Sequence, residues 1–158
     1  MAENYTRLAD TISSHEGKAY ITINGQNREL FEVSALSAQI DLIVQERRML
    51  GHRMTQHKVV GATGTGSMTM YFMNSEMLNQ AIQYIRSGQF RGFKVQVKNE
   101  DPASTIGKQE VVLLNVIPTS IPAAVIDDQS DDPITFDTDF TFDDIEILES
   151  FALPENYR

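Results

Sequence analysis

The chain has 158 residues, of which 41% are hydrophobic and 22% charged, and this is typical of one soluble globular domain with its own core. It contains no cysteine, which excludes disulfides, thiolate metal sites and cysteine nucleophiles. The formal net charge is -9, and from Gln109 onward the only basic residue is Arg158. Stable nucleic-acid binding is disfavoured, because phosphates are bound by Lys and Arg.

The N-terminal half of the chain predicts mainly strands. Residues 1–17 lack the basic-then-apolar pattern of a signal peptide and are expected to form a mobile segment. The runs AYITI and ELFEV flank the turn sequence NGQN and predict a hairpin over residues 19–33. Apolar and polar residues then alternate from Leu36 to Gln45, which predicts a strand with one dry face. The following segment, residues 46–58, has no sustained period and is interpreted as a long loop.

The stretch VVGATGTGSMTMYF, residues 59–72, has two interpretations. Its first half is similar to the glycine turn of a dinucleotide-binding domain, which must open a helix directly. Its second half alternates instead, and the chain offers too few helices for a parallel sheet. We therefore favour a strand in which Gly64 and Gly66 share a face with Met68 and Met70 and leave room for a bulky neighbour.

One helix is predicted between Asn74 and Gly88. Asn74 or Ser75 is placed to cap its first turn, and Gly88 is placed to end its last turn. The helix is expected to pack against the sheet through apolar residues at helical spacing, namely Met77, Leu78, Ala81, Ile82 and Ile85.

The C-terminal half predicts more strands. Residues 93–98 and 109–118 read as a hairpin around the turn-rich NEDPASTIG, and DDQSDDP breaks the chain before a last alternating strand. In that strand every second residue is apolar except Thr138: the apolar positions are Ile134, Phe136, Phe140 and Phe142. The whole chain, residues 1–158, is therefore expected to be one mainly β domain, a β-sandwich or partial barrel with one α-helix.

Catalytic, cofactor and metal sites are not expected. His52 and His57 are five residues apart in the predicted loop, and His15 has no companion, so no regular metal geometry results. The acidic run near residue 130 lacks the Gly and Glu of an EF-hand loop. No motif of a hydrolase nucleophile surrounds any serine.

Three segments resemble a known family. RRMLGHRMTQHKVVGATGTGSMTMYF, NEDPASTIGKQEVVLLNV and DFTFDDIEILESF are similar to the tail tube proteins of contractile phage tails, of the type found in PBSX-like prophages. The likeness runs in order from Lys18 to Phe151. It implies a tail tube fold in which six protomers close into a ring, strands of neighbouring protomers form one β-barrel around a lumen, and rings stack inside a contractile sheath.

The resemblance also implies partners and a location. The partners would be copies of the chain itself, the sheath, tape measure, baseplate and tail terminator proteins, and DNA only as passing cargo. The protein would be part of the virion, assembled in the bacterial cytoplasm, with no enzyme activity, cofactor or membrane. A small β-sandwich binding module and a nucleotide-binding enzyme that uses GATGTG remain the alternatives.

Two groups of residues are candidates for roles in such a tube. A DNA conduit should repel phosphate, so the acidic residues that alternate with the apolar ones are the candidates for the lumen. They are Asp41, Asp137, Asp139 and Asp143. The alternative is that they lie on an outer face of the sheet. The predicted loop at residues 46–58 would reach a neighbouring subunit, where its cations would pair with acidic groups. The alternative is a loop that is simply solvated. The cations are Arg47, Arg48, Arg53 and Lys58.

Overall fold

The protein is mainly β, as the sequence predicts. The computed structural model describes residues 5–23, 25–30, 32–129 and 131–157. Within these ranges lie one α-helix, two short 3-10 helices and eight strands: η1 (Leu8–Asp10), β1 (Gly17–Ile23), β2 (Gln26–Glu29), β3 (Val33–Arg47), β4 (Gln56–Tyr71), α1 (Glu76–Ser87), β5 (Phe93–Glu100), β6 (Lys108–Pro118), β7 (Thr135–Phe142), β8 (Asp144–Glu149) and η2 (Glu155–Tyr157).

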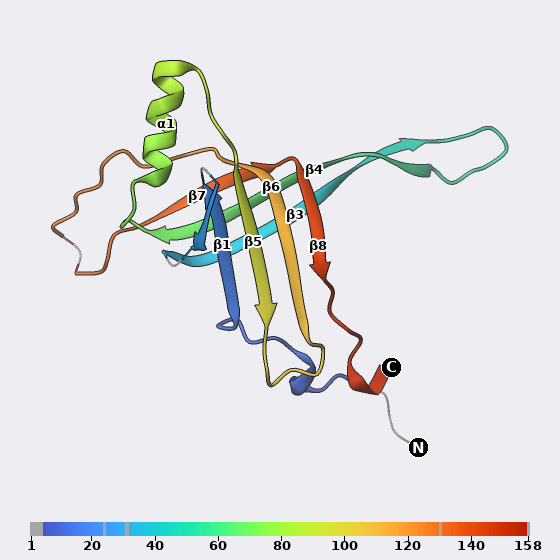
Figure 1. The fold of residues 1–158 in the computed structure, drawn as a ribbon. Coiled ribbons are helices and arrows are strands. Elements are labelled where there is room, and N and C mark those ends of the chain that lie inside the picture. Colours follow the sequence, from blue (N-terminus) through green and yellow to red (C-terminus); the bar gives the residue numbers. More distant parts are fainter. Residues whose placement is uncertain (1–4, 24, 31, 130, 158) are drawn as a thin grey trace.

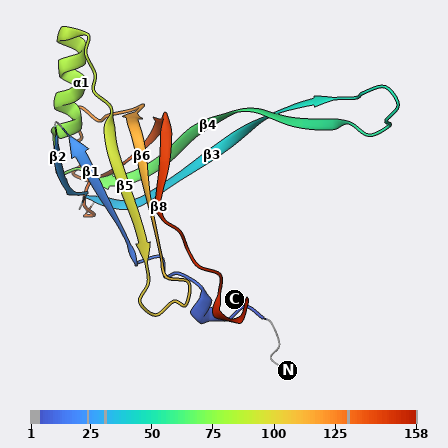
Figure 2. The ribbon, with the colours of Figure 1, turned by 45° about the vertical axis from the view of Figure 1, so that its right-hand side comes forward.

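All strand pairings in the described chain are antiparallel, and they join the strands into one sheet with the order β2-β1-β5-β6-β7-β4-β3, with β8 on β6. The sheet changes direction at β6, which pairs with β5 and β8 along most of its length and with β7 only at Ile117 and Pro118. Figures 1 and 2 show β1, β5, β6 and β8 as one layer that β7, β4 and β3 cross. The result is a sandwich of two layers.

The core lies between these two layers. Registered neighbours such as Ile21, Val95 and Leu113 face inward from one layer, and each is less than 5% exposed. The other layer contributes the apolar side chains of its inner face. For β7 these are the alternate positions that the sequence predicts. The buried hydrophobic cluster consists of Ile21, Leu30, Met68, Met70, Phe93, Val95, Leu113, Val116, Phe140 and Phe142.

Strands β3 and β4 continue beyond the sandwich as a two-stranded arm (Figure 1). They pair with each other as far as Arg47 and Gln56, whereas β7 pairs with β4 only between Gly64 and Tyr71. The predicted loop at residues 46–58 is therefore too long, and the connection covers only residues 48–55. The backbone ladder continues here although both faces are exposed, so the sequence shows no alternation of apolar and polar residues.

The first hairpin also differs from its prediction. Its turn is short, because Ile23 pairs with Gln26, and Gly25 has a φ of 80°. However, β2 ends at Glu29, and the predicted run ELFEV is not one strand. Leu30 is 3% exposed and its amide donates to the Ala19 carbonyl at 2.8 Å, so this segment turns inward before β3 begins.

Helix α1 is confirmed, with Ser75 at its N-cap and Gly88 at its C-cap with a φ of 75°. The Asn74 side chain accepts a hydrogen bond from the Glu76 amide at 2.8 Å. Its packing differs from the expectation, because Ile82 is 40% and Ile85 79% exposed. The helix stands at one end of the sheet in Figure 1, and Met77 in its first turn packs against the buried cluster.

The two ends of the chain lie together at the loop between β5 and β6. The Thr105 hydroxyl donates to Asp10 Oδ1 at 2.6 Å, and the Ala152 amide donates to the Ile106 carbonyl at 2.8 Å. Arg7 also pairs with Glu155 at 3.3 Å. These contacts hold both ends of the described chain against one loop, and the mobility of residues 1–17 stays a prediction.

Candidate assembly surfaces of the sheet

The face of β7, β4 and β3 that points away from the core is polar. Asp137 is registered with Thr69, and its carboxylate accepts a hydrogen bond from that threonine hydroxyl at 2.6 Å. Asp139 is registered with Ser67 in the same way, and Asp41 lies opposite Thr63 further along β3. Ser37, Gln39, Thr65 and Thr141 lie on the same face.

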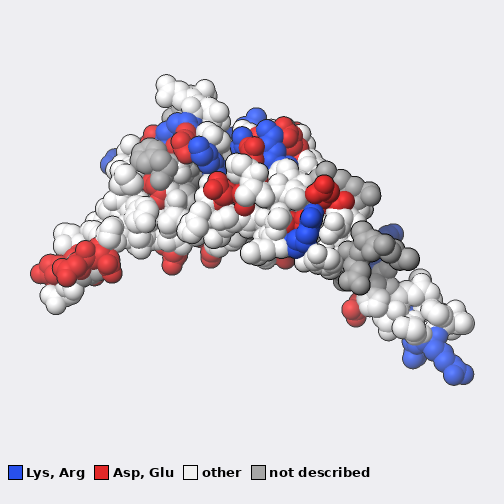
Figure 3. Space-filling model, turned by 90° about the horizontal axis from the view of Figure 1, so that it is seen from below, with Lys and Arg blue, Asp and Glu red and all other residues white. Residues whose placement is uncertain are grey.

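This polar face carries no cation over most of its length. The strand segments 33–44, 59–71 and 135–142 contain neither Lys nor Arg. Figure 3 shows the molecule as an arch with red atoms projecting from its concave edge. The structure thus brings Asp41, Asp137 and Asp139 onto one curved acidic face.

Asp143 lies apart from these three carboxylates. It follows the last residue of β7, at the bend before β8, and its amide donates to the Leu114 carbonyl at 3.0 Å. Its carboxylate accepts a hydrogen bond from the Asn115 side chain. The alternation predicted over β7 therefore ends one position before Asp143.

The two candidate glycines lie under aromatic rings. Gly66 is registered with Phe140 and Gly64 with Phe142, and these rings are 2% and 6% exposed. A Cβ at Gly64 would overlap the Phe142 ring, and a Cβ at Gly66 would overlap the Phe140 ring and approach the backbone oxygen of Ser37. The GATGTG segment therefore lies inside a continuous strand, without the strand-to-helix turn that a nucleotide site requires.

On the arm, the apolar face continues outward, and no other described part of the chain buries it. The face that is buried in the sandwich at Met68 and Met70 extends outward through Ile40, Leu42 and Val44. These three side chains are 47%, 59% and 48% exposed. β3 is also the last strand of the sheet, so its outer edge has no partner strand among the described residues.

The arm ends in a tip that is apolar and cationic, defined here as residues 47–58. Arg47 ends β3, Arg48 and Arg53 lie in the connection, and Lys58 of β4 is paired with Gln45 of β3. All four are exposed, and none of them forms an ion pair with a described part of the chain. Figure 3 shows blue atoms at this end of the arch and red atoms at the opposite end.

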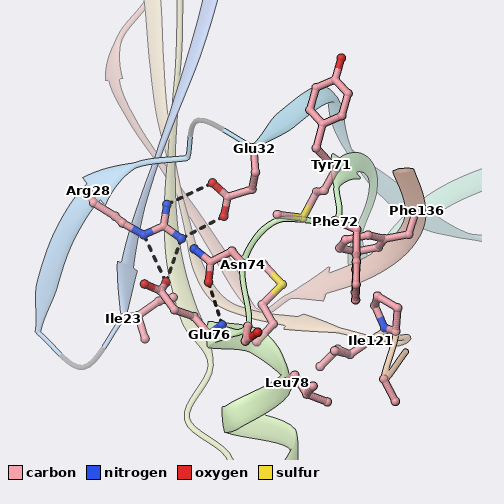
Figure 4. A pocket seen from close by; sticks show the side chains of 15 residues that line it. Ile23, Arg28, Glu32, Tyr71, Phe72, Asn74, Glu76, Leu78, Ile121 and Phe136 are labelled. Carbon is pink, nitrogen blue, oxygen red and sulfur yellow. Dashed lines mark hydrogen bonds and ion pairs between the residues drawn. The ribbon is translucent and has the colours of Figure 1, made fainter. Parts of the chain in front are cut away.

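The opposite end holds a pocket beside the first turn of α1 (Figure 4). Arg28 of β2 donates to both oxygens of Glu32 at 2.9 and 3.2 Å and to Glu76 of α1 at 2.8 Å. Glu32 is 1% exposed. Hydrogen bonding to Glu32 raises the pKa of the Arg28 guanidinium above its usual range. Sequence reasoning missed this cluster, because its three charges come from separate elements and follow no motif.

Other chemistry is sparse in the described ranges. His57 lies 3.4 Å from Glu46 on the arm, and no group of three or more His, Asp or Glu residues there could hold a metal ion. No helix in those ranges is both long and apolar enough to cross a membrane. Open strand edges and uncovered apolar surface instead characterise a subunit of a larger assembly.

Comparison with known proteins agrees with that class. The phage tail tube protein family matches residues 4–149, and this chain belongs to that family. The phage-like element PBSX protein XkdM of Bacillus subtilis strain 168 is 29% identical over 146 residues, which are 92% of this chain and 96% of that protein. The uncharacterized protein YqbM of the same strain is 29% identical over 143 residues, 90% of this chain and 94% of that protein.

Solved structures share the fold at low sequence identity. The sheath/tube terminator of an extracellular contractile injection system gives a TM-score of 0.68 at 14% identity, over 94% of this chain and 100% of that one. The tube terminating cap of the anti-feeding prophage gives 0.66 at 15% identity, over 95% of each chain. The tail tube resemblance and the mainly β fold are confirmed, and the chain is a structural tail tube protein rather than an enzyme.

Proposed function

We propose that this chain is the repeating subunit of the inner tube of a contractile phage tail or phage-tail-like particle. The observation that carries the proposal is the acidic face of Asp41, Asp137 and Asp139, which lies on strands with open edges. A sheet that is polar on its concave side and apolar on the other suits the wall of a water-filled barrel.

Ring closure would use the two edges of the β7-β4-β3 layer. Among the described residues β3 leaves its outer edge open. β7 pairs with β6 at two residue pairs, and the Thr119 amide after β6 donates to the Asp139 carbonyl at 2.8 Å, so the β7 edge before Thr138 has no partner strand there. Pairing β3 of one copy with the β7 side of the next would satisfy both edges and repeat around a closed ring. We propose six copies per ring, because a chain with the same fold occurs in the six-fold symmetrised baseplate of the anti-feeding prophage.

The closed ring would enclose a lumen with a negative field. Carboxylates and hydroxyls would line it, and no Lys or Arg would project from the three strand segments of the wall. Phosphate would not be held by counterion release, so DNA could pass through the tube without sticking. We propose the sheath, tape measure, baseplate and terminator proteins as partners, the virion as location and the bacterial cytoplasm as the place of assembly.

Electron microscopy of the purified chain at high concentration tests the proposal. We expect rings or tubes with six-fold symmetry and an open lumen. A chain that stays monomeric by light scattering, with and without the other tail proteins, would contradict the proposed function.

A matched pair of variants tests whether the uncovered arm is used in assembly. Ile40→Lys combined with Leu42→Lys should leave the fold intact, since exposed substitutions usually change stability by no more than about 0.5 kcal/mol. Tube formation should be lost, because the apolar face could no longer pack on a neighbour. The control is Leu8→Lys, a leucine that is 88% exposed outside the sheet, and it should assemble like the parent.

A further inference from the structure

We infer that the tip of the arm of one copy docks into the pocket end of a second copy, with Leu50 as its apolar anchor. This inference rests on the proposed tube function and names a contact between its subunits. The receiving surface, here called the pocket end, consists of the pocket beside α1 and the described residues of the segment that follows it, 121–129 and 131–132.

The tip presents apolar side chains that its own chain leaves uncovered. Leu50 is 105% exposed, Met54 73% and Met49 54%. The turn that carries them is ordered by a hydrogen bond from the His52 amide to the Met49 carbonyl at 3.3 Å, and by Gly51 with a φ of 84°. A leucine presented in this way is an anchor for a concave apolar site, since burying its exposed side chain removes apolar surface from water.

The pocket end offers such a concave site. Figure 4 shows Phe72, Leu78, Ile121 and Phe136 around the pocket, and the charged cluster at Arg28 closes its other side. Phe72 and Phe136 meet edge to face with centroids 6.4 Å apart. Ile121, Pro122 and Ala123, which lie in the segment after β6, line the pocket together with Leu78, and this apolar part of the lining suits an aliphatic side chain.

Charge favours the same pairing. The tip carries Arg47, Arg48, Arg53 and Lys58, and the segment after the pocket carries Asp127, Asp128, Asp131 and Asp132. The apolar anchors thus lie among cations on one surface, and the apolar pocket lies beside acids on the other. Electrostatic complementarity of this kind selects the partner and the orientation of docking.

The two surfaces lie at opposite ends of the molecule (Figures 1 and 3). The tip of one copy therefore cannot dock on the pocket end of the same copy. The contact joins different patches of two copies, so it is head-to-tail and propagates into a ring or a stack rather than a closed two-fold dimer.

Cross-linking between two cysteine variants tests the contact, and the parent background is clean because the chain has no cysteine. Chains with Leu50→Cys and chains with Ala123→Cys, a pocket-lining residue, are mixed with excess parent chain and treated with a short bis-maleimide. We expect a cross-linked dimer of the two variants. The control pair replaces Ala123→Cys by Lys18→Cys on β1, which is exposed and outside both surfaces, and it should give none.

Charge reversal gives a second, independent measurement. Arg48→Glu with Arg53→Glu should lose assembly while it melts like the parent, and Asp127→Lys with Asp128→Lys should do the same. A mixture of the two reversed chains should recover mixed contacts that the separate chains lack. All of these effects should weaken at high salt.

The outcomes separate this inference from the proposed function. Parent tubes that give no Leu50–Ala123 cross-link, or reversed chains that assemble like the parent, overturn the contact and leave the tube function standing. A parent chain that forms no tube overturns the tube function, and the cross-link in concentrated soluble protein then still decides whether the tip meets the pocket end.

Discussion

At the scale of single residues, two glycines show how a strand motif is explained by packing. Gly64 and Gly66 have ordinary extended backbones, so left-handed geometry is not the reason for them. They lie under the rings of Phe140 and Phe142, whose centroids are 6.5 Å apart, and the absence of a Cβ lets these rings lie against the neighbouring strand.

Gly64→Val should therefore destabilise the subunit by about 1–3 kcal/mol, because the new side chain collides with Phe142 in a packed core. Urea unfolding measures the change. Gly61→Ala is the matched control, since its Cβ would lie 3.4 Å from the flexible end of Ile43, and it should be close to neutral. Unchanged unfolding of Gly64→Val would refute the packing explanation.

The Arg28 cluster makes a second prediction at this scale. Arg28→Met leaves the buried carboxylate of Glu32 without its bidentate partner and frees Glu76 at the start of α1. We expect a loss of about 2–3 kcal/mol, less than for a fully buried pair because the guanidinium side chain is 27% exposed. Adding Glu32→Gln should recover part of the loss in chemical denaturation, and a double variant no more stable than Arg28→Met would contradict this account.

At the scale of elements, the terminal segments depend on a carboxylate. The Thr105 hydroxyl, the Arg7 amide and the Arg7 charge hold the pKa of Asp10 below its ordinary value, against the opposing effect of burial. A depressed pKa means that Asp10 stabilises the folded state above its unfolded pKa of about 3.9. This contribution is lost as the pH falls through the lower, folded value.

The acid limb of the stability curve should therefore change in Asp10→Asn. Between roughly pH 5 and pH 3 the parent should lose more thermal stability than the variant, because only the parent has this carboxylate to protonate. Glu155→Gln removes an exposed acid that also contacts Arg7, and it should follow the parent. Parallel melting curves for parent and Asp10→Asn across this range would disprove the role of Asp10.

Prediction from sequence succeeded for elements that bury one face in the chain's own core. The alternation of β7 and the caps of α1 gave the correct elements, since local chemistry determines them. It failed on the arm and on the outer stripe of α1, where apolar side chains such as Leu42 and Ile85 are exposed in the single chain. Pattern rules assume that apolar residues face the chain's own core, and they do not identify apolar side chains that the single chain leaves exposed.

At the scale of the whole molecule, the acidic concave face leads to a prediction about cargo. Replacing Asp41, Asp137 and Asp139 by Lys should preserve tubes, because these side chains are exposed, and should convert the proposed lumen wall into a surface that retains DNA. The control places the same charge change at Glu16, Glu29 and Glu146, which are also exposed and lie off the acidic face.

The measurement scores tube formation and DNA release separately in particles that carry each triple variant. We expect slow or incomplete release only for the lumen variant. Release at the parental rate and extent from well-formed tubes would mean that these three aspartates do not face the cargo.

The register between β4 and β7 also determines how the subunit bears force. A pull on the tip along the arm would slide β4 past β7, and the ladder from Gly64–Phe142 to Tyr71–Thr135 lies across that direction. Its hydrogen bonds would share the load together instead of opening one after another. The rings of Phe140 and Phe142 pack over Gly66 and Gly64, and this packing would also oppose the sliding of β4 past β7. The connection between the arm and the sandwich should therefore resist shear.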